Sequence, residues 1–131
     1  MRFLLDTNAV IALLNDGDSR TSRRARAYRP AEVGISAVVA HELYYGAFKS
    51  RRCDVNASLI DALQMEVVEF DKEDARQSGE IRAELAARGT PIGPYDILIA
   101  GQAKCRGLVL VTRNINEFGR VAGLQIENWE E

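Results

Sequence analysis

Asp6, Glu42 and Asp96 are the acidic residues whose positions along the chain suggest chemistry. Asp6 directly follows residues 3–5, an apolar run that suits a buried strand, and directly precedes a helical segment. In an open α/β sheet, a carboxylate at the carboxyl end of a strand lies in the crevice where such sheets bind ligands. Asp6 is equally suited to cap the following helix, because aspartate is a preferred N-cap residue. This stretch alone leaves both roles open.

Glu42 lies in a helix that the sequence predicts over residues 36–48, with Ser36 as its N-cap. Three- and four-residue spacing marks one apolar face of this helix, formed by Val38, Val39, Leu43 and Gly46. Glu42 falls on or beside that face, where an ionised carboxylate is costly unless something positive compensates it. The alternative is an ordinary surface position.

Asp96 falls in the first turn of a second predicted helix, which Pro94 opens and apolar residues continue to Ala103. A carboxylate in that turn is also favoured by the helix dipole, so its position alone does not prove chemistry. The apolar run 108–111 is typical of a central parallel strand. It ends in the polar cluster 112–114, which again places polar side chains at the end of a strand.

The elements that position these residues alternate along the chain between apolar runs and amphipathic segments. We expect strands at 3–5, 33–35, 67–70, 108–111 and 124–126. We expect helices at 9–14, 19–29, 36–48, 55–65, 71–88 and 94–103, with a short helical turn at 116–118. This order predicts a three-layer α/β/α fold in which helices cover both faces of a mostly parallel sheet of four to five strands. The length of 131 residues suits a single domain over 1–131.

Composition limits the classes of function. The chain is 47% hydrophobic and 27% charged, and it has no apolar run long enough to span a bilayer. We find no targeting segment, and Cys53 and Cys105 lack ligand or disulfide spacing, so we expect a cytoplasmic protein. A net charge of −2 argues against binding nucleic acid through a general positive field. A polyanion would have to be held by a local basic patch, such as residues 20–29 or 49–52, or through a metal ion.

Converging carboxylates favour a hard divalent cation. Acidic groups in a half-buried crevice repel one another, and Mg²⁺ or Mn²⁺ relieves that repulsion by taking oxygen ligands. Such an ion can polarise a phosphodiester and activate a water. The single histidine, His41, has no plausible nucleophile partner, so no Ser-His-Asp or Cys-His set competes for the site.

Four stretches resemble PIN-domain ribonucleases of the VapC toxin type, found in bacterial toxin–antitoxin pairs. They are FLLDTNAV at 3–10, ISAVVAHELYYGA at 35–47, TPIGPYDILIAGQA at 90–103 and LVTRNINEFGRVAGLQIENW at 110–129. They span nearly the whole chain in the order and spacing of the family. The resemblance implies a Mg²⁺- or Mn²⁺-dependent endoribonuclease with an RNA substrate, an antitoxin partner and a homodimeric state.

The resemblance also implies roles for individual residues. Asp6, Glu42 and Asp96 would be the catalytic, metal-binding acids. The family often has a fourth acid after the last central strand, and Asn114 stands at that place here. Because asparagine supplies no charge, we expect one well-held metal ion. Four neighbours would hold the carboxylates and waters in place, namely Thr7, Asn8, Thr112 and Asn114. Arg113 would contact a phosphate or pair with a local acid.

Two other functions remain as alternatives. A non-catalytic PIN-like binding module would keep the carboxylates as remnants and show no metal-dependent cleavage. A phosphatase of the haloacid dehalogenase kind also begins with an aspartate after its first strand. That chemistry needs a second aspartate two positions further on, where this chain has Asn8.

Overall fold

Five strands form one parallel sheet in the computed structural model, which describes residues 1–131. Their order across the sheet is β3-β2-β1-β4-β5, and every neighbouring pair is parallel. The strands are β1 (Phe3–Leu5), β2 (Val33–Ser36), β3 (Glu66–Val68), β4 (Val109–Val111) and β5 (Ile126–Glu127). The predicted parallel sheet is therefore confirmed, at the upper end of the expected strand number.

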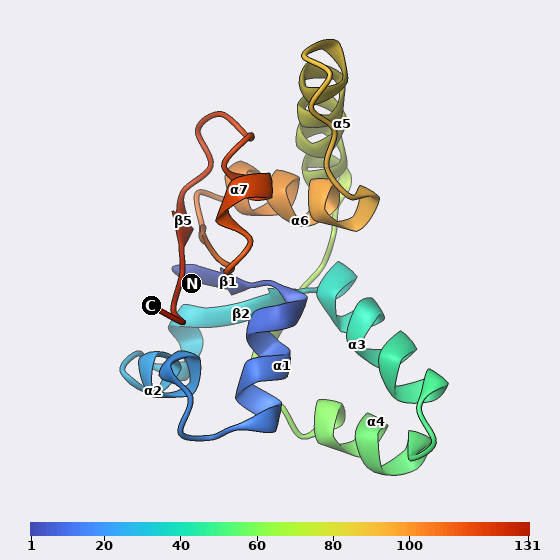
Figure 1. Cartoon of the computed structure of the whole chain (residues 1–131), viewed down its shortest axis with the longest axis vertical. Helices are drawn as coiled ribbons and strands as arrows, with labels where there is room; N and C mark the ends of the chain where they lie inside the picture. The colour runs from blue at the N-terminus through green and yellow to red at the C-terminus, as the bar shows by residue number, and fades with distance from the viewer.

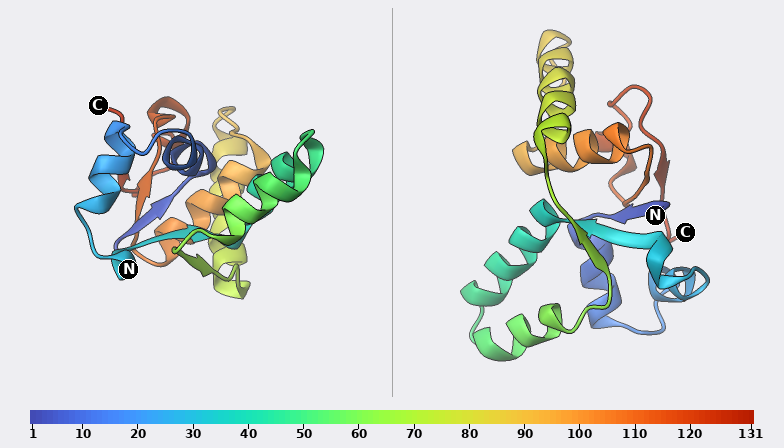
Figure 2. Two further views of the ribbon diagram at one scale, coloured as in Figure 1. Left: turned by 90° about the horizontal axis from the view of Figure 1, so that it is seen from below. Right: turned by 180° about the vertical axis from the view of Figure 1, so that it is seen from behind.

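Helices cover both faces of this sheet. They are α1 (Thr7–Asn15), α2 (Arg20–Arg26), α3 (Ala37–Lys49), α4 (Cys53–Asp61), α5 (Lys72–Ala87), α6 (Pro94–Cys105) and α7 (Ile115–Phe118), with a 3₁₀ turn, η1 (Pro30–Glu32). In Figure 1, α1 to α4 lie below the sheet and α5 to α7 lie above it. The view from behind, on the right of Figure 2, shows the same separation. The α/β/α layering predicted from the sequence is confirmed, and every helix is too short or too polar to span a bilayer.

The centre of the core is β1, whose three residues are all fully buried. Strands buried on both faces are apolar throughout rather than alternating, which explains the FLL run. Phe3 packs against Tyr28 and Trp129, at ring-centroid distances of 4.5 Å and 5.1 Å. Trp129 is 2% exposed. These contacts hold the C-terminal segment against β1 and the residues that follow α2.

Several boundaries differ from the sequence-based expectation. The helix expected to reach residue 65 ends at Asp61, and the next strand is β3 at 66–68 rather than 67–70. The strand stops early because the carbonyl of Glu69 accepts hydrogen bonds from the side chains of Gln102 and Arg106, at 2.8 Å and 3.0 Å. The last strand, β5, begins at Ile126 instead of residue 124. Gly123, with φ of 79°, forms the turn before it.

The segment at 19–29 is also shorter than expected. Ser19 caps α2 by accepting the amide of Ser22 at 3.0 Å. The helix ends at Arg26, because Arg29 precedes Pro30 and is extended, with φ of −68° and ψ of 147°. By contrast, the predicted long helix α5 has Asp71 as its N-cap and Gly89 with φ of 67° just past its end, as expected.

Candidate active site at the carboxyl ends of the strands

The carboxyl ends of β1, β2 and β4 lie side by side at one edge of the sheet, since these strands are parallel neighbours. Each end leads into a polar residue that the sequence analysis singled out. Asp6 follows β1, Ser36 ends β2 and caps α3, and Thr112 follows β4. The backbone amide of Asp6 donates to the carbonyl of Val111 at 3.0 Å, which fixes the two strand ends to each other. This edge is where ligands bind in open α/β sheets.

Asp6 caps α1 and also stands at the carboxyl end of β1, so its capping role is observed and its role as a metal ligand stays a prediction. Its side chain is 5% exposed, and Oδ1 accepts the amide of Ala9 at 2.9 Å, so it caps α1. Burial raises the pKa of Asp6, while the Thr112 hydroxyl and the Ala9 amide oppose that rise. The charge of Glu42 raises the pKa of Asp6 further, so the two acids lie within electrostatic reach. Capping uses one oxygen and leaves Asp6 at the crevice.

Thr7 links Glu42 to the start of α1. The Thr7 hydroxyl donates to Oε1 of Glu42 at 3.0 Å, across 35 positions of sequence. Glu42 is half-buried, because it lies beside the face of α3 that is buried against the core (Val39, Leu43 and Ala47). The hydrogen bond holds the Glu42 carboxylate beside Asp6 rather than letting it point into solvent.

Asp96 lies in the same crevice. Burial is the main cause that raises the pKa of Asp96 to about 6, and the charges of Glu117, Glu42 and Asp6 follow in that order. Three segments distant in sequence therefore bring the three predicted acids into mutual electrostatic contact. The raised pKa of Asp96 thus reflects first its burial and then the negative charge of the three neighbouring acids.

Glu117 is a fourth acid that the sequence analysis missed. It accepts hydrogen bonds from the amide of Gly93 at 2.8 Å and from Nδ2 of Asn114 at 2.7 Å. These two bonds lower the pKa of Glu117, so Glu117 keeps its charge while Asp96 carries the raised pKa. The missed signal was Glu117 itself, an acid three residues beyond Asn114 in the short helical turn that follows the last central strand.

Asn114 holds a carboxylate in place, as expected, and that carboxylate belongs to Glu117. It does not stand in place of the fourth acid but orients it, since its side chain donates to Glu117. Its backbone amide donates to the Thr112 hydroxyl at 2.9 Å, which leaves the hydroxyl proton of Thr112 free to face Asp6. Glu117 therefore supplies a fourth negative charge near the site, and the expectation of one well-held metal ion stays a prediction.

Gly93 allows Glu117 and Asp96 to come together. A Cβ atom at this position would lie 3.2 Å from Oδ2 of Asp96 and 3.8 Å from Oε1 of Glu117. The bare backbone lets the Gly93 amide reach Glu117, and Pro94 then starts α6 with Asp96 in its first turn, as predicted. The loop before α6 therefore positions both Glu117 and Asp96 at the site.

The donor set fits a hydrated hard cation rather than a preformed cage. No group of three or more histidine, cysteine, aspartate or glutamate side chains is arranged to enclose a metal ion. Mg²⁺, however, usually keeps several waters and binds proteins through only one or two carboxylates. The crevice offers oxygen ligands alone, whereas zinc sites usually also contain His or Cys. Its excess of negative charge calls for a divalent ion.

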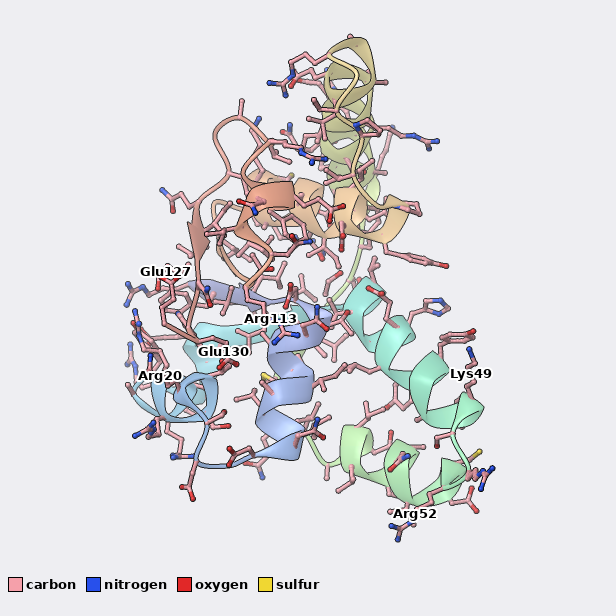
Figure 3. The ribbon with its side chains drawn as sticks, in the orientation of Figure 1. Arg20, Lys49, Arg52, Arg113, Glu127 and Glu130 are labelled. Atoms are coloured by element: carbon pink, nitrogen blue, oxygen red, sulfur yellow. The ribbon has the colours of Figure 1, made fainter.

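Arg113 and Asn8, the two remaining predicted site residues, are both exposed. Arg113 is exposed, lies beside the start of α1 in Figure 3, and forms no hydrogen bond or ion pair with the protein. Its charge lowers the pKa of Asp6, so it lies near the acids and is free to meet a phosphate. Asn8 is exposed, and its amide forms no hydrogen bond with the carboxylates it was expected to support.

Comparison with known proteins identifies the family. Residues 3–124 match the PIN domain. The chain is 40% identical over 131 residues to the tRNA(fMet)-specific endonuclease VapC of Salmonella typhimurium, covering 98% of each chain. It is 35% identical over 134 residues to ribonuclease VapC2 of Rickettsia felis, covering 100% of each.

Solved structures agree with the sequence relatives. The chain resembles a subunit of the DNA-bound VapBC complex from Salmonella typhimurium with a TM-score of 0.93 and 40% identity, over 98% of both chains. It resembles one of VapBC2 from Rickettsia felis bound to a promoter DNA fragment with a TM-score of 0.90 and 34% identity, over 98% of this chain and 99% of that one. The chain therefore belongs to the PIN-domain family, and within that family to the VapC ribonucleases.

Proposed function

We propose that this chain, acting as one PIN domain over residues 1–131, is a Mg²⁺-dependent endoribonuclease whose metal centre, held by Asp6 and Asp96, lies among the four acids Asp6, Glu42, Asp96 and Glu117. The observation that carries the proposal is the convergence of four carboxylates from separate segments at one sheet edge. Mn²⁺ has the same preference for oxygen ligands and is expected to substitute.

The relatives support the substrate and the biological setting. The sequence relatives, which match this chain over nearly their whole length, are named as an endonuclease and a ribonuclease. The solved structures are complexes of the VapBC toxin–antitoxin family. We infer that this chain cuts RNA in the cytoplasm as the toxin of such a pair and forms a homodimer. An apolar groove of about 260 Å³ runs between α1 and the α3–α4 pair and reaches Thr7 and Glu42. An antitoxin segment lying in that groove would cover the metal centre.

The residues act as a unit on a phosphodiester. A divalent cation, when bound, supplies polarisation of the scissile phosphate and activation of a water. Asp6 and Asp96 would hold the cation, and Gly93 and Asn114 keep Glu117 ionised beside them. Glu42, oriented by Thr7, accepts the proton of the attacking water, and Arg113 neutralises charge on the phosphate. The water oxygen joins phosphorus, and the departing RNA oxygen leaves with a proton from solvent.

The test is RNA cleavage by the purified protein, freed from any inhibitor, with Mg²⁺, Mn²⁺ or EDTA. Asp6→Asn, Glu42→Gln, Asp96→Asn and Glu117→Gln should each lower the cleavage rate at least a hundredfold while circular dichroism stays unchanged. Asp54→Asn, an exposed acid in the first turn of α4, is the matched control and should cut at the normal rate. Wild-type protein that binds RNA but never cuts it with either metal would identify a non-catalytic binding module instead.

A further inference from the structure

A cavity of about 200 Å³ lies beside the metal centre, outside the groove just described. Its walls come from α1, from the residues that follow β4 and from the C-terminal segment 128–130. This cavity is smaller than the pockets of about 300–1,000 Å³ that hold drug-sized ligands. It has room for one flat ring system and not for a chain of nucleotides.

The C-terminal wall of the cavity is fixed in place by specific contacts. The Thr21 hydroxyl, on a residue that is 1% exposed, donates to Oε1 of Glu130 at 2.6 Å. The amide of Glu130 donates to Oδ1 of Asn128 at 3.0 Å. Trp129, between them, stacks on Tyr28 with ring centroids 5.7 Å apart. The cavity is therefore formed before any ligand arrives.

The lining combines an apolar surface with unused polar groups. Ala9, Ala12 and Val111 are among its apolar residues. The side-chain amides of Asn8 and Asn15 form no hydrogen bond with the protein. Asn128 uses only its oxygen, and Glu130 uses only one carboxylate oxygen. A nucleobase has the complementary chemistry, because its faces are apolar and its edge carries donors and acceptors.

The cavity and the metal centre share a wall. Thr112 and Arg113 line the cavity, and both act on Asp6, the Thr112 hydroxyl as a hydrogen-bond partner and Arg113 through its charge. Asn8, also on the wall, lies two residues after Asp6. A phosphate held between Arg113 and the metal centre would therefore bring its own nucleoside to the mouth of the cavity.

We propose that this cavity receives one unpaired nucleobase next to the scissile phosphate and thereby selects the position at which RNA is cut. The inference rests on the proposed ribonuclease function. The free oxygen of Glu130 accepts hydrogen bonds, and an exocyclic amino group offers it two N–H donors where uracil has only its ring N3–H, so the cavity prefers adenine, cytosine or guanine to uracil. Asn8, Asn15 and Asn128 supply the remaining edge contacts.

Two variants test the cavity without touching the acids. Ala12→Leu fills the space, and Glu130→Gln keeps the oxygen that Thr21 needs but converts the free acceptor into a donor. The matched controls are Ala86→Leu and Glu84→Gln, both at exposed positions of α5. The substrate is a hairpin RNA with a randomised loop, and sequencing of the cut ends reads the base at each position.

We expect the wild type to disfavour uracil at one position beside the cut. Glu130→Gln should reduce that discrimination about tenfold, as expected for the loss of one good base contact. Ala12→Leu should raise KM with little change in kcat, and the α5 controls should match the wild type. Unchanged base selection in both cavity variants would overturn the proposal.

A second measurement keeps this inference separate from the ribonuclease assignment. In a Glu42→Gln background, which lacks the base and is not expected to cut but keeps Asp6 and Asp96 to hold Mg²⁺, binding of the fluorescent hairpin is followed by anisotropy in Mg²⁺. Adding Ala12→Leu should weaken that binding about tenfold, whereas adding Ala86→Leu should not. Equal binding by all three proteins would reject the cavity as a base site. Failure of the wild type to cut any RNA would instead reject the proposed function.

Discussion

Asp96→Asn should stabilise the metal-free protein while it abolishes cleavage. The pKa of Asp96 is raised, chiefly by burial and then by Glu117, from 3.8 to about 6. That difference corresponds to about 3 kcal/mol, and solvent screening at this half-buried group reduces it to about 1–2 kcal/mol. The folded protein bears this cost at neutral pH because Asp96 must ionise while half-buried and beside other negative charges. Asparagine removes the charge and the cost together.

The sign of the effect depends on pH. Between pH 3.8 and about 6 the folded state holds a proton that the unfolded state releases, so the stability of the wild type falls as pH rises through this window. Above about pH 6 the loss of stability caused by ionised Asp96 no longer changes with pH. The advantage of Asp96→Asn is therefore fully present at pH 8, smaller at pH 5 and absent near pH 4.

Urea unfolding of the two proteins in EDTA at pH 8, pH 5 and pH 4 measures this advantage, and addition of Mg²⁺ completes the experiment. Mg²⁺ should stabilise the wild type, since a ligand that binds only the folded state raises stability, and should leave Asp96→Asn unchanged. Asp18→Asn, at an exposed position outside the crevice, is the control and should stay within about 0.5 kcal/mol of wild type. A variant less stable than wild type at pH 8, or an advantage independent of pH, would refute the electrostatic description of the site.

Three further predictions concern the surroundings of the acids. Gly93→Ala should lower the cleavage rate about tenfold with the fold retained, because its Cβ would lie 3.2 Å from Oδ2 of Asp96; rates and circular dichroism measure this. Asn114→Ala removes the 2.7 Å bond to Glu117 and should weaken Mg²⁺ binding about 10–100-fold in calorimetry, whereas unchanged affinity would make Asn114 incidental. Arg106→Met leaves the fully buried Asp74 carboxylate without its 2.9 Å partner and should cost about 2–3 kcal/mol in urea unfolding, without altering Mg²⁺ affinity.

The sequence predicted most of the sheet because its strands are locally unambiguous. FLL at 3–5 and the apolar run ending at Val111 are buried on both faces, so their composition alone identifies them. The edges were less predictable. Val67 is 50% exposed, and β3 ends where the Glu69 carbonyl meets Gln102 and Arg106, residues more than thirty positions away. No local pattern contains that information.

The acids of the candidate site also differ in how far the sequence predicts them. Asp6, Glu42 and Asp96 were predictable because each stands at a position that its element defines, namely a strand end, an apolar helix face or a first helical turn. Glu117 was not, since its part depends on the Gly93 amide and on Asn114, which meet it only in the folded chain. An acid in a short polar turn resembles any surface acid until those partners are known.

The distribution of charge explains how a protein with a net charge of −2 can act on a polyanion. The expected basic rim on α2 is partly neutralised, because Arg24 pairs with Glu127 at 3.2 Å and Arg20 lies beside Glu130 (Figure 3). Lys49 and Arg52 stand at the far end of the α3–α4 pair, away from Arg113. Near the acids, Arg113 is the one cation that acts on Asp6. Without a metal ion the crevice repels a phosphate, so RNA affinity itself, and not only cleavage, should rise with Mg²⁺ concentration.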